Sequence, residues 1–394
     1  MDTSAKSSPF AAQETADLVR VAGLFAGIGG IELGLSQAGC EHSLLCEIDS
    51  QALAVLDHRF PGVKIERDVR EMSRLPRNVD LLSAGFPCQD LSQAGTTLGI
   101  SGRNSGLVAH VFRLLRRDRV PWVLLENVPF LLTLDRGRGM AYLVNSLERL
   151  GYNWAYRVVD TQSFGLPQRR QRVFLLASNV GDPESFLFDR DCKTTEAEPD
   201  PEIAHGFYWT EGNRGLGWAA DAVPAIKGGS GLGIPSAPAI WFPDGQLATP
   251  DIRDAERLQG FPVNWTRHAE SKGRPGFRWR LVGNAVSVPV ARWIGDRLLR
   301  PFQRPSLRSV AELQRNDCWP SAAFGGPRAG RFAVDAGPAP VAKARRHLHE
   351  FLRFDPKPLS WRAADGFMRR LQRSSLSRPE AFDRALARYV RLSA

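Results

Sequence analysis

The stretch "VRVAGLFAGIGGIELGLSQAG", residues 19–39, joins an apolar run to a glycine-rich turn and then to a helical pattern. Apolar runs and helical patterns keep alternating after it, in "HSLLCEID", "SQALAVLDHRF", "VDLLSAGFP", "GLVAHVFRLLRR" and "PWVLLENV". Such alternation indicates a parallel sheet with crossover helices, and continuous Val/Leu runs indicate strands that are covered on both faces. The sequence therefore predicts a doubly wound α/β domain, to which "NWAYRVVD" and the edge strand "RRQRVFLLAS" add two more strands.

The bulk composition restricts the class of protein. With 394 residues the chain is long enough for one large core, a second domain and a tail. Its five cysteines are odd in number and form no C-x-x-C pair, so we expect a reducing cytoplasm, no disulfide framework and no metal site. No apolar run approaches the roughly 20 residues of a membrane span. We expect no membrane partner, and interpret residues 1–19 as a polar leader.

The charge of the chain is unevenly distributed. The formal net charge is +10, and residues 301–394 hold 18 Lys/Arg against 8 Asp/Glu, so the whole excess lies in this segment. Residues 179–202, in contrast, hold eight acids against two bases. This pattern favours a polyanionic partner that is kept to one side of the protein, and solvated loops are the open alternative.

The pattern along the chain predicts four regions. The leader is followed by a catalytic domain over residues 20–178, completed by residues 281–300, by a loop-rich domain over residues 179–280, and by a basic extension over residues 301–394. Thr249 and Pro250 are expected to open a helix. The extension should end in a helix that Ser377 and Glu380 cap, with an apolar face of Phe382, Leu386, Tyr389 and Val390.

The glycine-rich turn lies where open α/β sheets bind nucleotides. After Gly27 and Gly29, the third glycine of a dinucleotide fingerprint would fall at position 32, which is Glu32. An adenosine ligand without phosphates therefore fits better than a dinucleotide. Glu47 follows the next apolar run and can accept two ribose hydroxyls, and Asp68 is placed to reach an adenine amino group. Together these residues favour S-adenosylmethionine as the cofactor.

A thiol and a carboxyl group are expected at the same edge of the sheet. Cys88 follows the strand "VDLLSAGF" in a proline-led loop, and Glu126 ends the strand "VLLENV". This pair suggests a nucleophile with an acid partner, although most free cysteines are small buried hydrophobes. Gln168, Arg170 and Arg172 alternate along the edge strand, where they either hold a planar polar ring and phosphates or form a solvated edge.

Six blocks in order, "FAGIGG", "GFPCQ", "ENV", "QRRQR", "RLQGFP" and "GNAVSVPVA", resemble those of the DNA (cytosine-5) methyltransferase family of bacterial type, from about Val21 to Leu299. The resemblance implies a Rossmann-like domain with a mixed, mostly parallel sheet and a small target-recognition domain between "QRRQR" and "RLQGFP". It also implies that Cys88 bonds to C6 of a flipped-out cytosine in duplex DNA, while C5 takes the methyl group. Glu126 would contact N3 and the amino group, Arg172 would bind O2, Arg170 would support the loop, and residues 89–103 would form a lid.

The resemblance also assigns binding residues. Further cofactor contacts are expected at Phe25, Ala26, Ile48, Val69, Pro87, Leu107, Asn284 and Val286. The family often has Phe where this chain has Val108, directly after Leu107, which weakens the transfer at Leu107. DNA contacts are expected at Gln89, Ser92 and Gln168, and base-reading donors at Arg214, Lys227, Arg253, Lys272 and Arg274.

Three alternatives to this function stay open. The tRNA-methylating branch of the family shares the catalytic residues, although Gln89 in "PCQ" favours the DNA branch. A catalytically idle DNA-binding module would have no reason to retain Cys88, Glu126 and Arg172 together. A thiol hydrolase would need a histidine close to Cys88 in space. We expect a monomeric, nucleoid-associated enzyme in a bacterial cytoplasm. A restriction or defence protein is a further candidate partner, and the DNA sequence that is recognised stays open.

Overall fold

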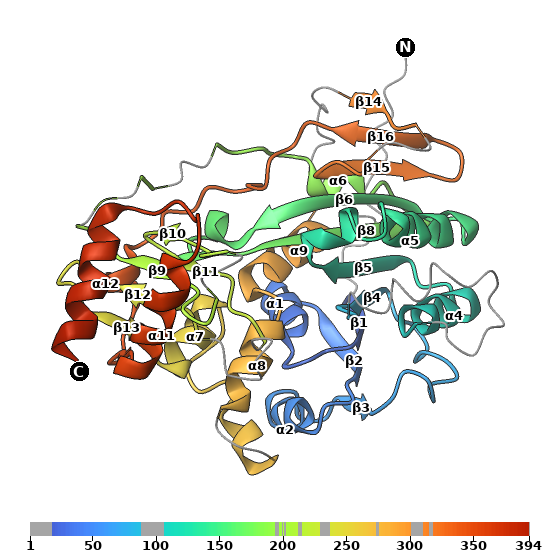
Figure 1. Ribbon diagram of the computed structural model, residues 1–394. Helices are drawn as coiled ribbons and strands as arrows, with labels where there is room; N and C mark the ends of the chain where they lie inside the picture. The colour runs from blue at the N-terminus through green and yellow to red at the C-terminus, as the bar shows by residue number, and fades with distance from the viewer. Residues whose placement is uncertain are drawn as a thin grey trace.

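In the computed structural model, the described residues are 18–87, 106–193, 197, 198, 200, 202–211, 215–228, 237–272, 276–300, 310–314 and 318–393. A ten-stranded sheet runs through the larger part of the molecule (Figure 1). Its strand order is β14-β16-β15-β6-β8-β5-β4-β1-β2-β3. The strands are β1 (Arg20–Leu24), β2 (Glu41–Cys46), β3 (Lys64–Glu66), β4 (Leu81–Ala84), β5 (Trp122–Asn127), β6 (Asn153–Asp160), β8 (Gln171–Ser178), β14 (Val310–Glu312), β15 (Ala322–Gly326) and β16 (Gly330–Val334).

The sheet is mixed and mostly parallel, as predicted. The strands from β1 to β5 pair in parallel, β8 lies antiparallel between β5 and β6, and β15 and β16 continue antiparallel beyond β6. The prediction that the strand ending near Ser178 is an edge strand was wrong, because β8 has partners on both sides. Its inner position explains the apolar run from Val173 to Ala177, which is buried on both faces.

Helices cover both faces of the sheet. Successive residues of β1 face opposite layers: Val21 packs with α1 (Gly30–Ala38), α6 (Glu184–Leu187) and α9 (Val288–Leu299), and Ala22 packs with α4 (Val108–Asp118) and α5 (Arg138–Arg149). The helices α1 and α9 touch closely, because a Cβ at Gly34 would lie 2.5 Å from that of Ala291. The "GNAVSVPVA" segment therefore returns to the first helix of the domain.

A second, smaller sheet forms beside the first, on the left of Figure 1. Its order is β10-β9-β12-β13-β17, with β9 (His205–Phe207), β10 (Ala219–Ala220), β12 (Ala239–Trp241), β13 (Leu247–Thr249) and β17 (Lys357–Pro358). The expected helix after Thr249 begins later, at α7 (Ile252–Leu258), where the Asp251 carboxylate accepts from the Arg253 amide. The remaining elements are α2 (Ser50–Arg59), η1 (Pro129–Leu132), η2 (Thr161–Phe164), β7 (Gln168–Arg169), β11 (Val223–Pro224), η3 (Arg267–Lys272), α8 (Phe277–Asn284) and α10 (Leu348–Phe351).

The segment after Arg300 is built into both domains. Strands β14 to β16 extend the large sheet, β17 extends the small sheet, and α11 (Trp361–Gln372) and α12 (Glu380–Leu392) pack on the small sheet. The expected apolar face of the last helix is confirmed, with Phe382, Leu386 and Val390 buried. The expected cap was wrong, since Pro379 holds the N-cap position without a side-chain hydrogen bond. No helix among the described residues is long and apolar enough to cross a membrane.

Candidate active site

The glycine-rich turn after β1 is held by Glu47, just past β2. The Glu47 carboxylate accepts hydrogen bonds from the backbone N–H groups of Gly27 at 2.7 Å, Ile48 at 2.9 Å and Asp49 at 2.8 Å. Gly27 has a φ of +56°, and a Cβ there would project into open space. The same turn gives Phe25 a positive φ, which is uncommon for a residue with a side chain. A carboxylate and an open backbone therefore face the crevice at the carboxyl ends of β1 and β2.

The neighbouring residues suit an adenosine group. The apolar side chain of Ile48, directly after Glu47, is 65% exposed. Asp68 follows β3, and the hydrogen bonds that it accepts from Arg70 hold the pKa of its carboxyl below the ordinary value. Val69 is buried. A ribose acceptor, an apolar surface for a ring and an ionised acid thus line one edge, so the residues present fit S-adenosylmethionine.

The other expected cofactor residues lie on several segments of the chain, and Val286 is the one in contact with the glycine-rich turn among the described contacts. The Val286 carbonyl lies against Gly30, where a Cβ would come within 2.5 Å, and the Asn284 side chain lies against Gly228. Phe25 and Leu107 both pack on the core cluster below the crevice. Ala26 donates its N–H to the Cys46 carbonyl at 3.1 Å, and Pro87 is exposed after β4, next to the expected nucleophile.

An acid and a guanidinium group meet at the end of β5. The Oε1 atom of Glu126 lies 3.2 Å from Nε of Arg172 on β8. Glu126 is almost fully buried, and this burial raises the pKa of its carboxyl, while the charges of Arg172 and Arg170 oppose the rise. A carboxyl that keeps its proton more readily than usual can donate a hydrogen bond to a ring nitrogen, as general acids do.

Arg170, whose charge also acts on Glu126, is completely buried inside the protein. Its guanidinium donates to the carbonyls of Ile226 at 3.1 Å, Gly283 at 3.1 Å and Ala285 at 2.7 Å. Arg170 therefore links the start of β8 to Ile226 in the small domain and to the segment between α8 and α9. Among the described residues, the hydrogen bonds of the Arg170 guanidinium all go to backbone carbonyls of its own chain.

Gln168 was wrongly predicted to contact DNA. Its side chain is completely buried, its amide donates to the Leu258 carbonyl at 2.8 Å, and its Oε1 accepts from the Ile226 amide at 3.1 Å. The period-2 pattern in "QRRQR" placed it on an exposed edge, but the small domain covers that edge. Through these hydrogen bonds, Gln168 connects the large domain to the segments of Leu258 and Ile226.

The remaining predictions concern DNA contacts. Lys227 forms an ion pair with Glu211 and lies 3.8 Å above the Tyr208 ring, while Arg253 pairs with Asp251 at 2.8 Å. Lys272 ends η3. Outside the described residues lie Cys88, Gln89, Ser92, Arg214, Arg274 and the expected lid over residues 89–103.

Asn127 was not predicted from the sequence, although it lies directly after Glu126 at the end of β5. Its Nδ2 donates to the Phe86 carbonyl at 3.0 Å and its Oδ1 accepts from the Val128 amide at 2.9 Å. Asn127 therefore fixes the strand end that carries Glu126 to the loop that leads to Cys88. The signal was present in the "ENV" block, where only the acid was interpreted.

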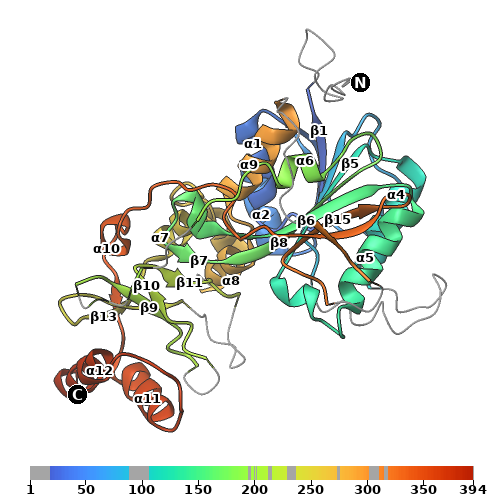
Figure 2. The same cartoon turned by 90° about the horizontal axis from the view of Figure 1, so that it is seen from above.

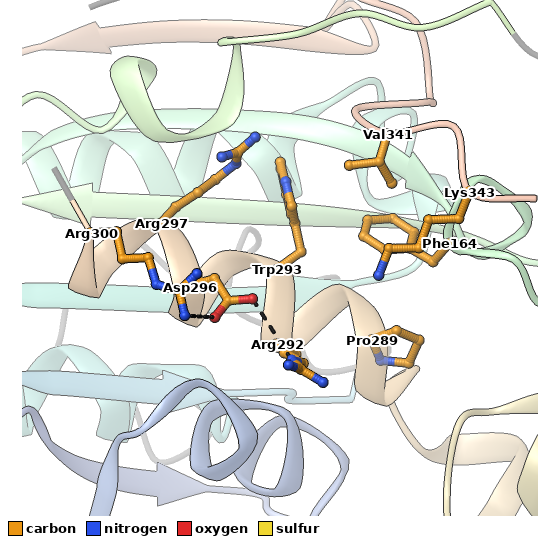
Figure 3. A pocket seen from close by; sticks show the side chains of 9 residues that line it. All are labelled: Phe164, Pro289, Arg292, Trp293, Asp296, Arg297, Arg300, Val341 and Lys343. Atoms are coloured by element: carbon orange, nitrogen blue, oxygen red, sulfur yellow. Dashed lines mark ion pairs between the residues drawn. The ribbon is translucent and has the colours of Figure 1, made fainter. Parts of the chain in front are cut away.

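A separate cavity of about 290 Å³ lies along the outer side of α9 (Figure 3). It contains none of the predicted site residues, and its lining is Phe164, Pro289, Arg292, Trp293, Asp296, Arg297, Arg300, Val341 and Lys343. The predicted catalytic residues among those described therefore lie at the ends of the strands and not in this cavity. Among the described residues no group of three or more His, Cys, Asp or Glu side chains could hold a metal ion.

Comparisons with known proteins give the same assignment. The family model "C-5 cytosine-specific DNA methylase" matches residues 19–205. Type II methyltransferase M2.BsuMI of Bacillus subtilis is 49% identical over 369 residues, which cover 90% of this chain and 94% of that protein. Type II methyltransferase M.NgoBI of Neisseria gonorrhoeae is 30% identical over 303 residues, which cover 68% and 89%. The crystal structure of S. pombe Dnmt2 methyltransferase aligns with a TM-score of 0.48 at 18% identity. The alignment covers 71% of this chain and 98% of that chain.

The fold and the crevice define a Rossmann-like, S-adenosylmethionine-dependent methyltransferase. The chain belongs to the C-5 cytosine-specific DNA methylase family and is a DNA (cytosine-5) methyltransferase. The alignment with M2.BsuMI leaves out only a tenth of this chain. Residues 301–394 alone form nearly a quarter of the chain. That relative therefore shares at least part of the segment after Arg300.

Proposed function

We propose that the enzyme methylates C5 of a flipped-out cytosine in a specific short DNA sequence, through a covalent bond between Cys88 Sγ and C6. The observation that supports this most is the contact between Glu126 and Arg172, at the strand end next to the one that leads to Cys88. A nucleophile, an acid and a fixed cation would then surround one planar ring.

The proposed step begins at C6, because C5 of cytosine is a poor nucleophile. The Cys88 thiolate adds to C6, while Glu126 donates a hydrogen bond to N3 and accepts one from the amino group. Arg172 binds O2. S-adenosylmethionine would supply the electrophilic methyl group that C5 takes, with S-adenosylhomocysteine as the leaving group. A base removes the C5 proton, and the electron pair that is released expels the Cys88 thiolate and restores the ring.

Trapping of the covalent bond tests this step. Fluorine at C5 cannot be eliminated, so a duplex with 5-fluorocytosine should form a denaturant-stable adduct in the presence of the cofactor. Cys88→Ala should form no adduct, and Cys318→Ala, which changes an exposed free cysteine, should form as much as the wild type. An adduct with Cys88→Ala would overturn the assignment. Adduct formation with tRNA in place of duplex DNA would favour the tRNA-methylating alternative.

Reading of the target sequence is proposed for the small domain. The backbone of Lys227 lies beside Gly283, at the junction of the small domain with the end of helix α8, which contains Asn284. Changing Lys227 or Arg214 to Ala should alter the methylated sequence or the DNA affinity and leave the cofactor affinity normal. Because the relatives named above are Type II methyltransferases, we infer that the chain also acts as the modifying member of a restriction-modification pair.

A further inference from the structure

The last two helices carry much of the excess positive charge of the chain. Residues 357–393, which contain α11 and α12, hold nine Lys/Arg against three Asp/Glu. Their apolar side chains are used for folding, since Phe367, Leu371, Phe382 and Leu386 are buried against the small sheet. The charged side chains are therefore left on the opposite, outward side.

The arginines form a stripe on each helix. On α11 and its C-cap, Arg362, Arg369 and Arg373 are spaced by seven and four residues, which places them on one side of a helix. On α12, Arg384, Arg388 and Arg391 are spaced by four and three residues. All six are exposed. We call these six residues the arginine face.

Acids neutralise only part of the arginine face. Asp365 pairs with Arg369 at 2.9 Å, and Glu380 pairs with Arg384 at 3.3 Å. The other four arginines of the face are Arg362, Arg373, Arg388 and Arg391. Within the part of the chain that the structure describes, these four make no ion pair and no side-chain hydrogen bond. Four cations are thus free to bind an anionic partner.

The arginine face is joined to a loop of the small domain. Arg370 of α11 donates to the carbonyls of Trp209 at 2.9 Å and Glu211 at 2.8 Å, and Glu211 pairs with Lys227. The chain then continues to Arg214, an expected base-reading residue. In Figure 2, α11 and α12 lie below the small domain, on the side opposite to α1 and α9. Helix α11 is therefore held against the segment of Trp209 and Glu211, which also holds Lys227.

We propose that the arginine face binds the phosphates of duplex DNA that flanks the target sequence. The inference rests on the proposed function, because it adds a second contact region to the same DNA. A face of cations fits a polyanion better than a protein surface, whose interface centres are apolar and depleted in charge. The exposed large apolar residues near it are Trp361 and Leu392, which stand at the helix ends and form no patch.

Binding to duplexes of two lengths tests the inference. The short duplex holds the methylated sequence with a few base pairs, and the long duplex extends it on both sides. Salt-dependent affinity is measured for the wild type, for Arg362→Gln with Arg373→Gln, and for Arg388→Gln with Arg391→Gln. The matched control is Arg292→Gln on helix α9 with Arg300→Gln at its C-cap, a pair that removes the same charge away from α11 and α12. Melting curves should be unchanged, because these side chains lie outside the core.

Each lost phosphate contact should lower the slope of log affinity against log salt by roughly 0.9 on the long duplex. The wild type and the control should gain affinity with duplex length, and both α11–α12 variants should lose this gain while methylating the same sequence. Wild-type slopes in both variants, or an equal loss on both duplexes, would overturn the inference. If the inference about the arginine face fails, methyl transfer to the short duplex by every variant would show that the proposed function still holds. Absence of methyl transfer by the wild type would instead refute the proposed function.

Discussion

The Oε1 atom of Glu126 and the Nε atom of Arg172 lie 3.2 Å apart across the antiparallel strands β5 and β8. The contact brings together two residues that are 46 positions apart in the sequence. Burial raises the pKa of the acid, while the guanidinium group keeps the side chain in place. The ion pair thereby holds this carboxyl in one position at the end of β5.

Replacement of Glu126 should slow methyl transfer and leave the affinity for the cofactor unchanged. Glu126→Gln keeps the shape of the side chain and removes the proton, so we expect the methylation rate to fall by roughly 10²-fold or more. Single-turnover transfer to duplex DNA measures the rate, and calorimetry measures cofactor affinity. A large loss of cofactor affinity would instead place Glu126 at the cofactor.

Ile48 should act in binding and not in folding. Its side chain is 65% exposed, so Ile48→Ala should leave the melting temperature unchanged. Loss of the apolar surface under the adenine should weaken cofactor binding by about tenfold, which corresponds to about 1.4 kcal/mol. Val180→Ala, at another exposed apolar residue, serves as the control in the same calorimetric titration. Equal affinities for Ile48→Ala and the control would remove Ile48 from the site.

Glu32 should make stability depend on pH. Its carboxyl is buried beneath the cofactor turn, accepts from Ser83 at 3.3 Å, and has a pKa that burial raises from 4.5 to about 7. The folded state thus binds more protons than the unfolded chain between these values, so the free energy of unfolding falls as pH rises through this window. The loss amounts to about 3 kcal/mol.

Replacement of the buried carboxyl should remove this dependence. Glu32→Gln does not titrate, so its free energy of unfolding relative to the wild type should rise between about pH 5 and about pH 8, by up to about 3 kcal/mol. Denaturant unfolding at a series of pH values measures the difference. The same pH dependence in both proteins would show that Glu32 ionises as it does in water.

The C-terminal helices should be needed for stability. Phe382 is completely buried among Phe207, Trp218 and Trp241, so Phe382→Ala should lower the free energy of unfolding by about 3 to 5 kcal/mol. Leu392→Ala, at a residue that is 76% exposed, should change it by less than about 0.5 kcal/mol. If Phe382→Ala were as stable as Leu392→Ala, the helices would not belong to the folded core.

The catalytic domain was largely predictable because its elements follow local rules. The apolar run before Gly27 became β1, the acids Glu47 and Asp68 followed β2 and β3, and Glu126 lies in β5. These features depend on the period of the hydrophobic pattern and on the shared edge of parallel strands. Nearby residues of the chain determine both.

The errors arose where distant segments meet. Gln168 looked exposed because nothing in "QRRQR" shows that Leu258 and Ile226 cover it. The segment after Arg300 was predicted to be a basic extension that ends in one helix, because its short strands and scattered apolar residues show no sustained period. Its place in both sheets depends on pairings such as Ala323 with Tyr156, which are 167 residues apart. Non-local pairing of this kind leaves little signal in one sequence.

Methylation sequencing of DNA and tRNA from a bacterial host that expresses the chain tests the central claim most directly. We expect 5-methylcytosine in DNA at one short sequence, and none in hosts that express Cys88→Ser or Glu126→Gln at equal protein levels. Unmodified DNA together with newly methylated tRNA would contradict the account, and so would DNA methylation that persists in the Cys88→Ser host.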